Sequence, residues 1–187
     1  RHLLKNSNLK LIYIHDESIN GLVEAKATSL KYNSCDYISF FDDDIVLEKE
    51  YFDEIEKILK KDNSIVGLNG KILNYPKLPF LKKKIFGMTH IGIFKDNRIN
   101  SQLNNSNSDK LILLTVLSGG LSTWNKSVFE KVKFDVINKF HSYEDQEFSI
   151  RVKKFISKKL FLAPNAKLYH NHSQINRLKY LKKYKID

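Results

Sequence analysis

The chain has 187 residues, enough for one domain with a hydrophobic core, and 42% of them are hydrophobic, which excludes a disordered chain. Its net charge is +11, from 32 Lys and Arg against 21 Asp and Glu. Such a surplus favours polyanionic partners, namely nucleic acid, anionic lipid or phosphorylated substrates. The single Cys35 excludes a disulfide framework and a cysteine-based zinc site, and it fits a reducing compartment.

Strand and helix patterns alternate along the first seventy residues. Residues 9–14, 38–41 and 65–73 are apolar, β-prone runs that predict strands. Between them, apolar side chains recur at helical spacing over residues 18–32 and 48–61. The order strand–helix–strand–helix–strand predicts βαβ units and a largely parallel sheet.

The pattern breaks over residues 74–110, where prolines and polar runs predict loops with one short strand at 89–94. The elements predicted after it are, in order, a strand at 111–117, a turn at 118–120, a helix at 124–132, a helix at 144–155, and two short strands at 160–162 and 167–170 on either side of Pro164. No repeat or domain linker interrupts them, so one domain is expected.

Three adjacent carboxylates, Asp42, Asp43 and Asp44, directly follow the predicted strand at 38–41. They repel one another, so a fold that keeps them must offset their charge. A divalent cation does this well because hard cations bind carboxylate oxygens, and ligands of open α/β sheets lie beyond the carboxyl ends of the strands. The triplet therefore indicates a cation site, with the alternative that Asp43 or Asp44 merely starts the next helix.

Four features follow one another in an informative order. They are Gly21-Leu22-Val23-Glu24-Ala25-Lys26, the triplet Asp42-Asp43-Asp44, the turn Ser118-Gly119-Gly120 with Trp124 and Phe129 after it, and the pair Glu144-Asp145 with His170 and His172 after it. This order resembles the family 2 glycosyltransferases of the GT-A fold, with their Gly-Leu-x-x-Ala-Arg-Asn helix, Asp-x-Asp motif, Gly-Gly loop, Glu-Asp pair and C-terminal His. The resemblance covers residues 9–173, and the joint occurrence is more specific than any one motif. It implies an α/β fold, a three-layer sandwich with a mainly parallel central sheet.

On the donor side, the resemblance implies that Asp42 and Asp44 are the two ends of the Asp-x-Asp motif. Asp44 would bind Mn²⁺ or Mg²⁺ together with His170, so these two side chains should lie close together, and Asp42 would contact the ribose or the metal. Asp43 and Lys26 would belong to the donor site, with Lys26 near the nucleotide. Lys26 stands where the family usually has Arg, and it cannot form the bidentate fork of a guanidinium.

On the acceptor side, the resemblance implies that Gly119 and Gly120 line the sugar pocket, where the absence of side chains lets the donor approach. Trp124 would lie near the acceptor. Asp145 would be the general base, and Glu144 would help to orient the acceptor.

Each of these residues also has an ordinary structural explanation. Glu144 and Asp145 could be acids in the first turn of a helix, where the helix dipole favours them. His170 and His172 are two residues apart and would share one face of a strand, so either could meet the metal, and either could be packed or solvated. Trp124 alone could be a core residue.

The leading interpretation is a metal-dependent glycosyltransferase that moves a sugar from a nucleotide-diphosphate sugar to a hydroxyl of a glycan, lipid-linked or protein acceptor. With one base and no second nucleophile, we expect inversion at the anomeric carbon. The alternatives are a metal-dependent phosphodiesterase or nuclease using the same acids, and a non-catalytic basic module on nucleic acid or membrane. The Gly-Gly turn and the Lys26 helix favour the first. We find no set of aromatic residues to stack along a basic groove, so nucleic acid is not an expected partner.

Residues 1–173 are expected to form the glycosyltransferase domain, without counterparts of the family's first two strands, and residues 174–187 a basic tail. As a helix, residues 176–185 would be basic and partly amphipathic, which suits anionic lipid; the alternative is a solvated helix end. The sequence shows no signal peptide and no apolar run of membrane-span length. We therefore expect a cytoplasmic protein, peripheral at the inner membrane face.

Overall fold

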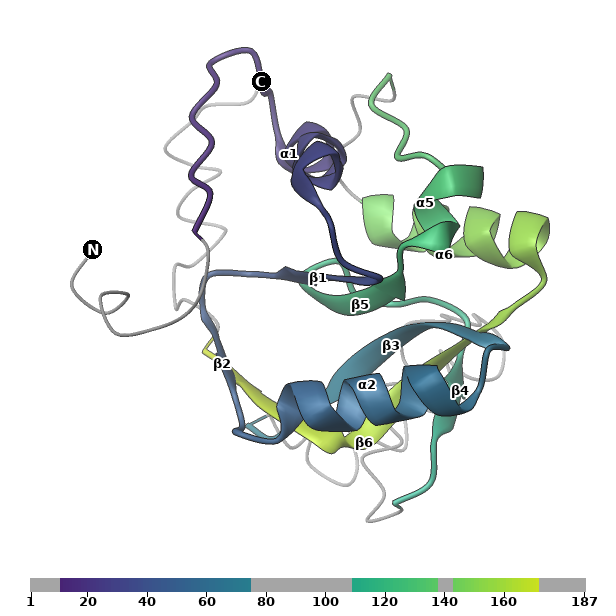
Figure 1. Ribbon diagram of the computed structural model, residues 1–187. Coiled ribbons are helices and arrows are strands. Elements are labelled where there is room, and N and C mark those ends of the chain that lie inside the picture. The colour runs from purple at the N-terminus through teal and green to yellow at the C-terminus, as the bar shows by residue number, and fades with distance from the viewer. Residues whose placement is uncertain (1–10, 75–108, 138–142, 172–187) are drawn as a thin grey trace, which may run out of the picture.

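The computed structural model describes residues 11–74, 109–137 and 143–171, which form a mixed α/β fold (Figure 1). Its elements, in chain order, are α1 (Leu22–Ser29), the 3-10 helix η1 (Leu30–Tyr32), β1 (Tyr37–Phe41), β2 (Ile45–Leu47), α2 (Tyr51–Lys61), β3 (Ile65–Ile72), β4 (Ile112–Leu114), β5 (Leu121–Asn125), α5 (Ser127–Lys131), α6 (Glu144–Ile156) and β6 (Lys159–His170). None of the helices in these ranges has the length and apolar character needed to cross a bilayer.

The described strands form one sheet in the order β1-β5-β3-β6-β2, and β4 also pairs with β6. β5 is antiparallel to both of its neighbours, β1 and β3, and β2 and β4 are antiparallel to β6. Only the pair β3–β6 is parallel among the described strands. The α/β class is confirmed, but the expectation of a mainly parallel sheet is wrong. The chain leaves β1, passes through α2 and enters β3 in the same direction, as the sequence pattern predicts, but β5 lies between these two strands and runs the other way.

This topology gathers several strand ends at one edge of the sheet. β1, β3 and β6 all run in the same direction, so their carboxyl ends lie together, beside the amino end of β5. Asp42 follows β1, His170 ends β6 and Gly120 precedes β5. The carboxyl ends of strands are where ligands of α/β sheets bind, so the fold brings the predicted site residues to this edge.

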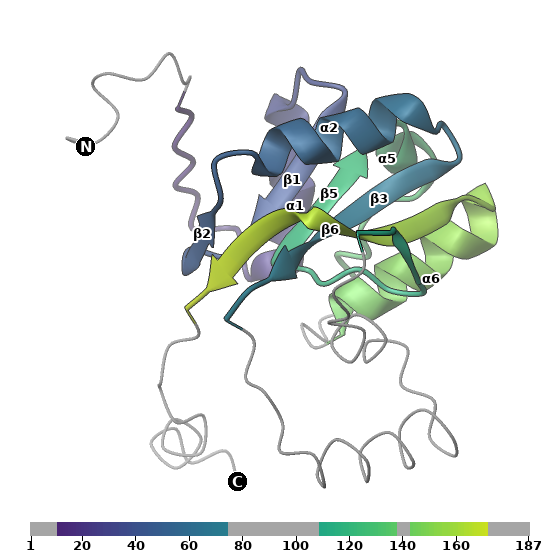
Figure 2. The same cartoon turned by 90° about the horizontal axis from the view of Figure 1, so that it is seen from below.

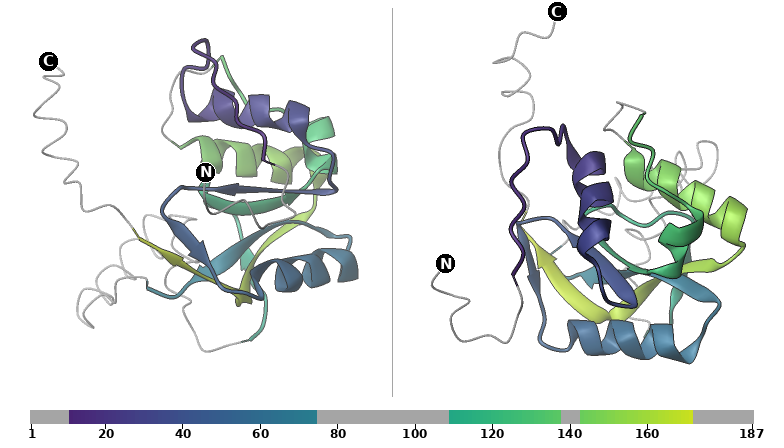
Figure 3. Two further views of the ribbon diagram at one scale, coloured as in Figure 1. Left: turned by 60° about the vertical axis from the view of Figure 1, so that its left-hand side comes forward. Right: turned by 45° about the horizontal axis from the view of Figure 1, so that its top comes forward.

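Helices cover both faces of the sheet, as the edge-on view in Figure 3 shows. α2 lies across one face (Figure 2), and α1, α5 and α6 lie on the other. Each face has its own apolar core. The core beneath α5 and α6 includes Val66, Trp124, Val128, Phe148, Val152 and Leu160. The core beneath α2 includes Tyr51, Ile55, Leu59, Leu68, Ala163 and Leu168.

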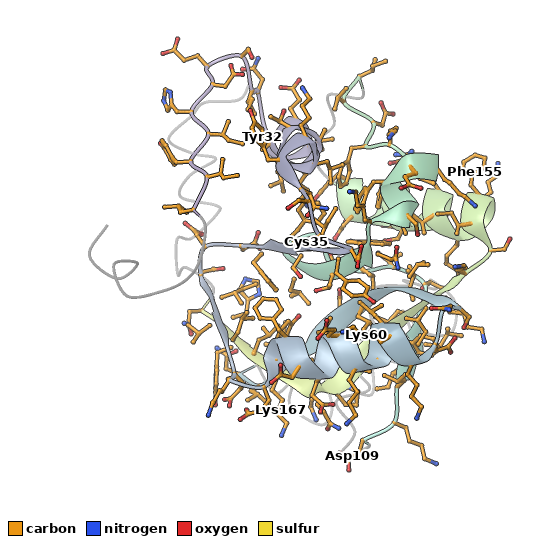
Figure 4. All side chains as sticks on the ribbon, in the orientation of Figure 1. Tyr32, Cys35, Lys60, Asp109, Phe155 and Lys167 are labelled. Carbon is orange, nitrogen blue, oxygen red and sulfur yellow. The ribbon has the colours of Figure 1, made fainter. Side chains whose placement is uncertain are left out.

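α2 shows how the sequence produces this packing. Tyr51, Ile55 and Leu59 recur every four residues and are 0%, 3% and 3% exposed. Burying a large apolar side chain contributes about 1.5–3 kcal/mol. On the outer surface, Lys60, labelled in Figure 4, pairs with Glu56 at 2.7 Å. The helix predicted over residues 48–61 is confirmed, with its start at Tyr51.

β6 replaces the two short strands predicted around Pro164. The strand runs unbroken from Lys159 to His170, and its pairing with β3 shifts register between Ala163 and Lys167. A proline cannot donate to a strand ladder, so it is tolerated where pairing is interrupted at a bulge. The irregularity spans Pro164 and lets both predicted segments belong to one strand.

The helix predicted over residues 124–132 is wrong at its beginning. Trp124 lies on β5, opposite Ile38 of β1 and Gly67 of β3, and the helix α5 covers only Ser127–Lys131. Gly67 makes room for the indole, because a Cβ at Gly67 would lie 2.9 Å from Trp124 Cε3. Packing across the sheet, which local periodicity does not reveal, therefore decides the state of this segment.

Two other predicted strands differ from the structure. The strand predicted at 111–117 is confined to Ile112–Leu114. Residues 11–14, the described part of the strand predicted at 9–14, have no strand structure. The strand predicted at 89–94 lies outside the described residues, as does the helix expected at 176–185.

Candidate active site

Two ladders bring the acidic triplet and His170 together. The backbone N–H of Asp42 donates to Gly120 O at 2.9 Å, which extends the β1–β5 pairing by one residue. In the β2–β6 pair, Ile45 lies opposite His170, and Asn171 N donates to Asp44 O at 2.9 Å. Ligand atoms of Asp42, Asp44 and His170 consequently lie within 4.8 Å of one another.

The geometry of this cluster fits a divalent cation. His170 Nε2 lies 3.0 Å from Asp44 Oδ1 and 3.9 Å from Asp42 Oδ2, so the predicted proximity of Asp44 and His170 is confirmed. Asp44 Oδ1 is buried and accepts no hydrogen bond of good geometry within the described ranges. A buried carboxylate oxygen left in this state is costly unless a cation satisfies it. Two carboxylates are suitable ligands for Mn²⁺ or Mg²⁺, and the imidazole supplies a third ligand atom.

Gly119 and Gly120 allow acidic side chains to approach the turn from two sides. A Cβ at Gly120 would overlap the carboxylate of Asp42. A Cβ at Gly119 would lie 2.6 Å from Glu144 Oε1 and 2.9 Å from Lys26 Nζ. The absence of side chains thus admits protein groups from β1, α1 and α6, so the turn joins the cation cluster to a second cluster of charged residues.

Lys26 and Glu144 form an ion pair in this second cluster. Lys26 Nζ lies 3.0 Å from Glu144 Oε1, and the two side chains are only 8% and 14% exposed. The ammonium also lies 5.6 Å from the centre of the Phe40 ring. Lys26 comes from α1 and Glu144 from the first turn of α6, so the pair joins two helices on the same face of the sheet.

Asp145, the next residue along, has different partners from Glu144. Gly119 N donates to Asp145 Oδ2 at 3.3 Å, and Gln146 N donates to Asp145 Oδ1 at 2.7 Å. In the part of the chain that the structure describes, no Lys, Arg or His forms an ion pair with Asp145. The two adjacent acids therefore differ in their partners. Lys26 offsets the charge of Glu144, whereas the Asp145 carboxylate accepts hydrogen bonds from the backbone N–H groups of Gly119 and Gln146.

The helix that carries both acids begins at an unusual backbone conformation. Tyr143 has φ 71° and ψ 20°, the left-handed region that non-glycine residues rarely adopt. Such a residue costs on the order of 1–3 kcal/mol and persists where its surroundings fix it. The conformation sets the direction in which α6 leaves Tyr143, and with it the placement of Glu144 and Asp145. No residue pattern around Tyr143 predicts this conformation.

Trp124, which the resemblance places near the acceptor, is buried in the structure. It is 3% exposed, its Nε1 donates to Ser122 Oγ at 3.0 Å, and its ring packs edge-on against Phe148 at 5.2 Å between centroids. It is a core residue, so the ordinary structural explanation accounts for its position. Asp43, by contrast, is exposed beside the cluster, and His172 lies outside the described residues.

One residue near the site was missed by the sequence reasoning. Asn74 follows β3, and its side-chain amide forms two hydrogen bonds with the backbone of His170, at 2.9 and 3.0 Å. A polar residue at the start of a loop is common, so the sequence alone offers no signal for this contact.

A cavity of about 490 Å³ lies away from these clusters. Its lining includes residues of α2 and the turn after it, together with Asp109, Leu111, Pro164 and Asn165. It contains none of the predicted site residues, so the candidate site is defined by converging side chains at the sheet edge and not by this cavity.

No family model and no curated protein sequence matches this chain. Among solved structures, its fold is similar to that of GalNAc-T7 with UDP, GalNAc and Mn²⁺: the match has a TM-score of 0.59 and 13% identity, and covers 83% of this chain. The chain has a GT-A-like fold. A second match, A197 from STIV, has a TM-score of 0.50 and 15% identity, and covers 83% of this chain and 70% of that one. The match to GalNAc-T7 covers only 31% of the length of the GalNAc-T7 chain. At these identities, both structural similarities show the fold alone.

Proposed function

We propose that this chain carries the catalytic domain of a metal-dependent glycosyltransferase, which moves a sugar from a nucleotide-diphosphate sugar to a hydroxyl acceptor. The observation that carries the proposal is the convergence of Asp42, Asp44 and His170 at the carboxyl edge of a GT-A-like sheet. GalNAc-T7, whose fold is similar, was solved with UDP, GalNAc and Mn²⁺. The acceptor would be a glycan, a lipid-linked molecule or a protein.

Asp42, Asp44 and His170 would hold Mn²⁺ or Mg²⁺. When bound there, the cation would stabilise the negative charge that develops on the diphosphate leaving group. Asp42 is 45% exposed and Asp44 29% exposed, so the cluster is open enough for a donor to reach it. Asp43, exposed beside them, would contact the donor from the solvent side.

Asp145 would be the general base. In the transfer, the acceptor oxygen forms a bond to the anomeric carbon while the bond from that carbon to the diphosphate oxygen breaks, and the hydroxyl proton passes to Asp145. Glu144 is less suited to this task because Lys26 offsets its charge at 3.0 Å. With a single base and no protein nucleophile in the proposal, transfer would invert the anomeric configuration.

The turn at Gly119 and Gly120 lies between the proposed base and the proposed cation site, so we treat the two as parts of one active site. Gly119 N bonds the proposed base, and Gly120 O bonds the backbone of Asp42. Consecutive peptide groups of one turn thus connect the proposed base to the proposed cation site. Under this proposal Lys26 lies near the nucleotide and also offsets the charge of Glu144, 3.0 Å away.

Thermal unfolding of the full natural chain tests the function. UDP-sugars with Mn²⁺ should stabilise the protein, by about 2.7 kcal/mol at a ligand concentration a hundred times Kd. For a domain of this size, that is a rise in Tm of roughly 5–10 °C. The rise should require both Mn²⁺ and the nucleotide sugar, and the Asp44→Asn variant should lose it.

The main alternative is a metal-dependent phosphodiesterase or nuclease, which the net charge of +11 favours. Oligonucleotides are therefore the matched comparison in the same experiment. Stabilisation by oligonucleotide and not by nucleotide sugar, with cleavage in Mn²⁺, would establish the nuclease. Stabilisation by oligonucleotide without any need for metal would instead indicate a non-catalytic basic module.

Residues 1–173 would form the glycosyltransferase domain and residues 174–187 a basic tail, in a cytoplasmic protein peripheral at the inner membrane face. The described residues end at 171, so the support for the tail is its sequence alone. Co-sedimentation with anionic vesicles tests the membrane contact. Binding that is undiminished after deletion of residues 176–187 would refute it.

A further inference from the structure

The side chain of Asn74 connects the carboxyl ends of β3 and β6. Its Oδ1 accepts a hydrogen bond from His170 N at 2.9 Å, and its Nδ2 donates to His170 O at 3.0 Å. Both backbone groups of one residue are therefore bound by a single side-chain amide. That residue carries the imidazole of the cation cluster.

The side-chain amide of Asn74 extends the hydrogen bonding between β3 and β6 beyond the end of β3. The parallel pairing of β3 with β6 reaches Ile72 opposite Leu168, and Leu73 N donates to Leu168 O at 2.8 Å. A side-chain amide offers a carbonyl acceptor and N–H donors, as a peptide group does. Asn74 therefore continues the ladder to His170 by one step after the strand itself has ended.

β2 fixes β6 from the opposite side. Lys167 O and Asn171 N both bond the β2 segment, with Asn171 N donating to Asp44 O at 2.9 Å. Bonds in an antiparallel pair alternate along each strand, so the backbone groups of His170, between these residues, face the β3 side. Asn74 meets them there. Asp44 is thus placed by one ladder, and His170 by the same ladder together with Asn74.

We propose that Asn74 is a positioning residue for His170, and that the affinity of the Asp42, Asp44 and His170 cluster for a divalent cation depends on it. The inference rests on the cation site in the proposed function. Without the amide, the last residue of β6 would be held from one side only, and its ring would no longer be fixed 3.0 Å from Asp44 Oδ1. Partners that orient a metal ligand typically contribute about 10–100-fold to metal affinity.

A purely structural role for Asn74 makes a different prediction. If Asn74 only terminates β3, its loss should lower the stability of the fold and leave the affinity for a cation unchanged. Metal affinity and stability must therefore be measured separately on the same variants. Asn74 is exposed, so its truncation is expected to leave the protein folded.

Titration of the full natural chain with Mn²⁺ alone, followed by calorimetry or by the EPR signal of free Mn²⁺, provides the first measurement. The Asn74→Ala variant should bind Mn²⁺ about tenfold more weakly than the unmodified chain. Asn125→Ala is the matched control. The Asn125 side chain accepts two hydrogen bonds, from Ser127 N at 2.9 Å and Ser127 Oγ at 2.7 Å, but it lies opposite Tyr37 at the far end of β1 from Asp42. The control should lose stability without losing Mn²⁺ affinity.

Amide hydrogen exchange at His170 is the second measurement. Its N–H donates to Asn74 Oδ1, so exchange at this amide should accelerate in Asn74→Ala and not in Asn125→Ala. Unchanged exchange would overturn the inference. So would unchanged Mn²⁺ affinity in Asn74→Ala while His170→Ala weakens binding, a result that leaves the proposed function standing.

The remaining outcomes separate the inference from the function. If the unmodified chain binds no Mn²⁺, the cation site and the inference fall together. If Mn²⁺ affinity depends on Asn74 as expected, but nucleotide sugars with Mn²⁺ do not stabilise the protein, the inference holds and the glycosyltransferase function fails.

Discussion

Replacing Lys26 by Met tests how the two charged clusters are supported. Lys26 and Glu144 are 8% and 14% exposed and 3.0 Å apart, so the substitution leaves Glu144 with a buried and unpaired charge. Removing one partner of a buried ion pair costs about 3–5 kcal/mol. Glu144 lies in the first turn of α6, where the helix dipole offsets ~0.3–1 kcal/mol of this cost. We expect a loss of about 3 kcal/mol in the free energy of unfolding.

The double variant Lys26→Met/Glu144→Gln separates the charge from the packing. It removes both charges and keeps side chains of similar length, and replacing a whole buried pair is often close to neutral. It should therefore be more stable than Lys26→Met alone by roughly 2 kcal/mol, although it carries one more substitution. Both variants lose the ammonium that lies 5.6 Å from the centre of the Phe40 ring, so the loss of this interaction cancels when they are compared.

Urea unfolding at 25 °C measures these differences. Lys60→Met is the matched control, because Lys60 pairs with Glu56 at 2.7 Å on the exposed side of α2, where the side chains are 64% and 52% exposed. Water screens that pair, so the control should change stability by no more than the error of the measurement. A loss in Lys26→Met no larger than in the control would contradict the reasoning. Additive losses in the double variant would show that the pair is not coupled.

Four further variants test the site and its surroundings. Asp145→Asn should keep Mn²⁺-dependent donor binding and lose transfer by ~10²–10⁴ in rate; near-normal transfer would remove Asp145 as the base. Asp44→Asn should weaken donor binding itself, measured by thermal shift. Gly120→Ala should displace the Asp42 carboxylate and weaken Mn²⁺ binding by about tenfold, with an unchanged circular dichroism spectrum. Burial raises the pKa of Tyr51 to about 12, above the value of about 10 in an unfolded chain, so stability should fall by about 2–3 kcal/mol as pH rises from about 10 to 12, because only the unfolded state ionises. Tyr51→Phe should abolish that fall in urea unfolding at high pH.

Elements that depend on their own periodicity were predicted well from the sequence. The helix predicted at 48–61 is α2, Tyr51–Lys61. Its buried stripe begins at Tyr51, whereas Phe52, the residue expected to share a side with Ile55 and Leu59, is 53% exposed. The helix predicted at 144–155 is α6, Glu144–Ile156. The acidic triplet was correctly placed after a strand. In each case the information lies within about a dozen consecutive residues, so neighbouring side chains decide the structure.

Elements that depend on distant partners could not be predicted in the same way. β2 has only three residues, Ile45–Leu47, and exists as a strand through its pairing with residues 168–170 of β6. Trp124 resembles a helix position in sequence, but a glycine on β3 makes a place for its ring across the sheet. The insertion of β5 between β1 and β3, which makes the sheet mixed, is likewise a choice of partner that no local pattern contains.

In the candidate site, too, local sequence information was sufficient for some features and insufficient for others. The motif residues could be found from their order, but their partners could not: Lys26 and Glu144 are 118 positions apart, and Asn74 and His170 are 96 positions apart. The resemblance implies that Lys26 lies near the nucleotide, but it does not indicate which side chain Lys26 contacts within the protein. In the structure Lys26 pairs with another motif residue, Glu144, and a single carboxylate oxygen requires one donor and not a bidentate fork.

The register of β1 and β5 is a requirement of the site in its own right. Asp42 reaches the turn because Phe41 pairs with Leu121, and the hydrogen bond between the Ser39 and Thr123 hydroxyls, at 2.8 Å, lies across the same ladder. A slip of one residue would turn every side chain of β1 to the opposite face of the sheet. Asp42 would then leave both Gly120 and the cation cluster, although no motif residue had changed. The strand before the acidic triplet therefore contributes to the site by fixing the pairing that places the acids.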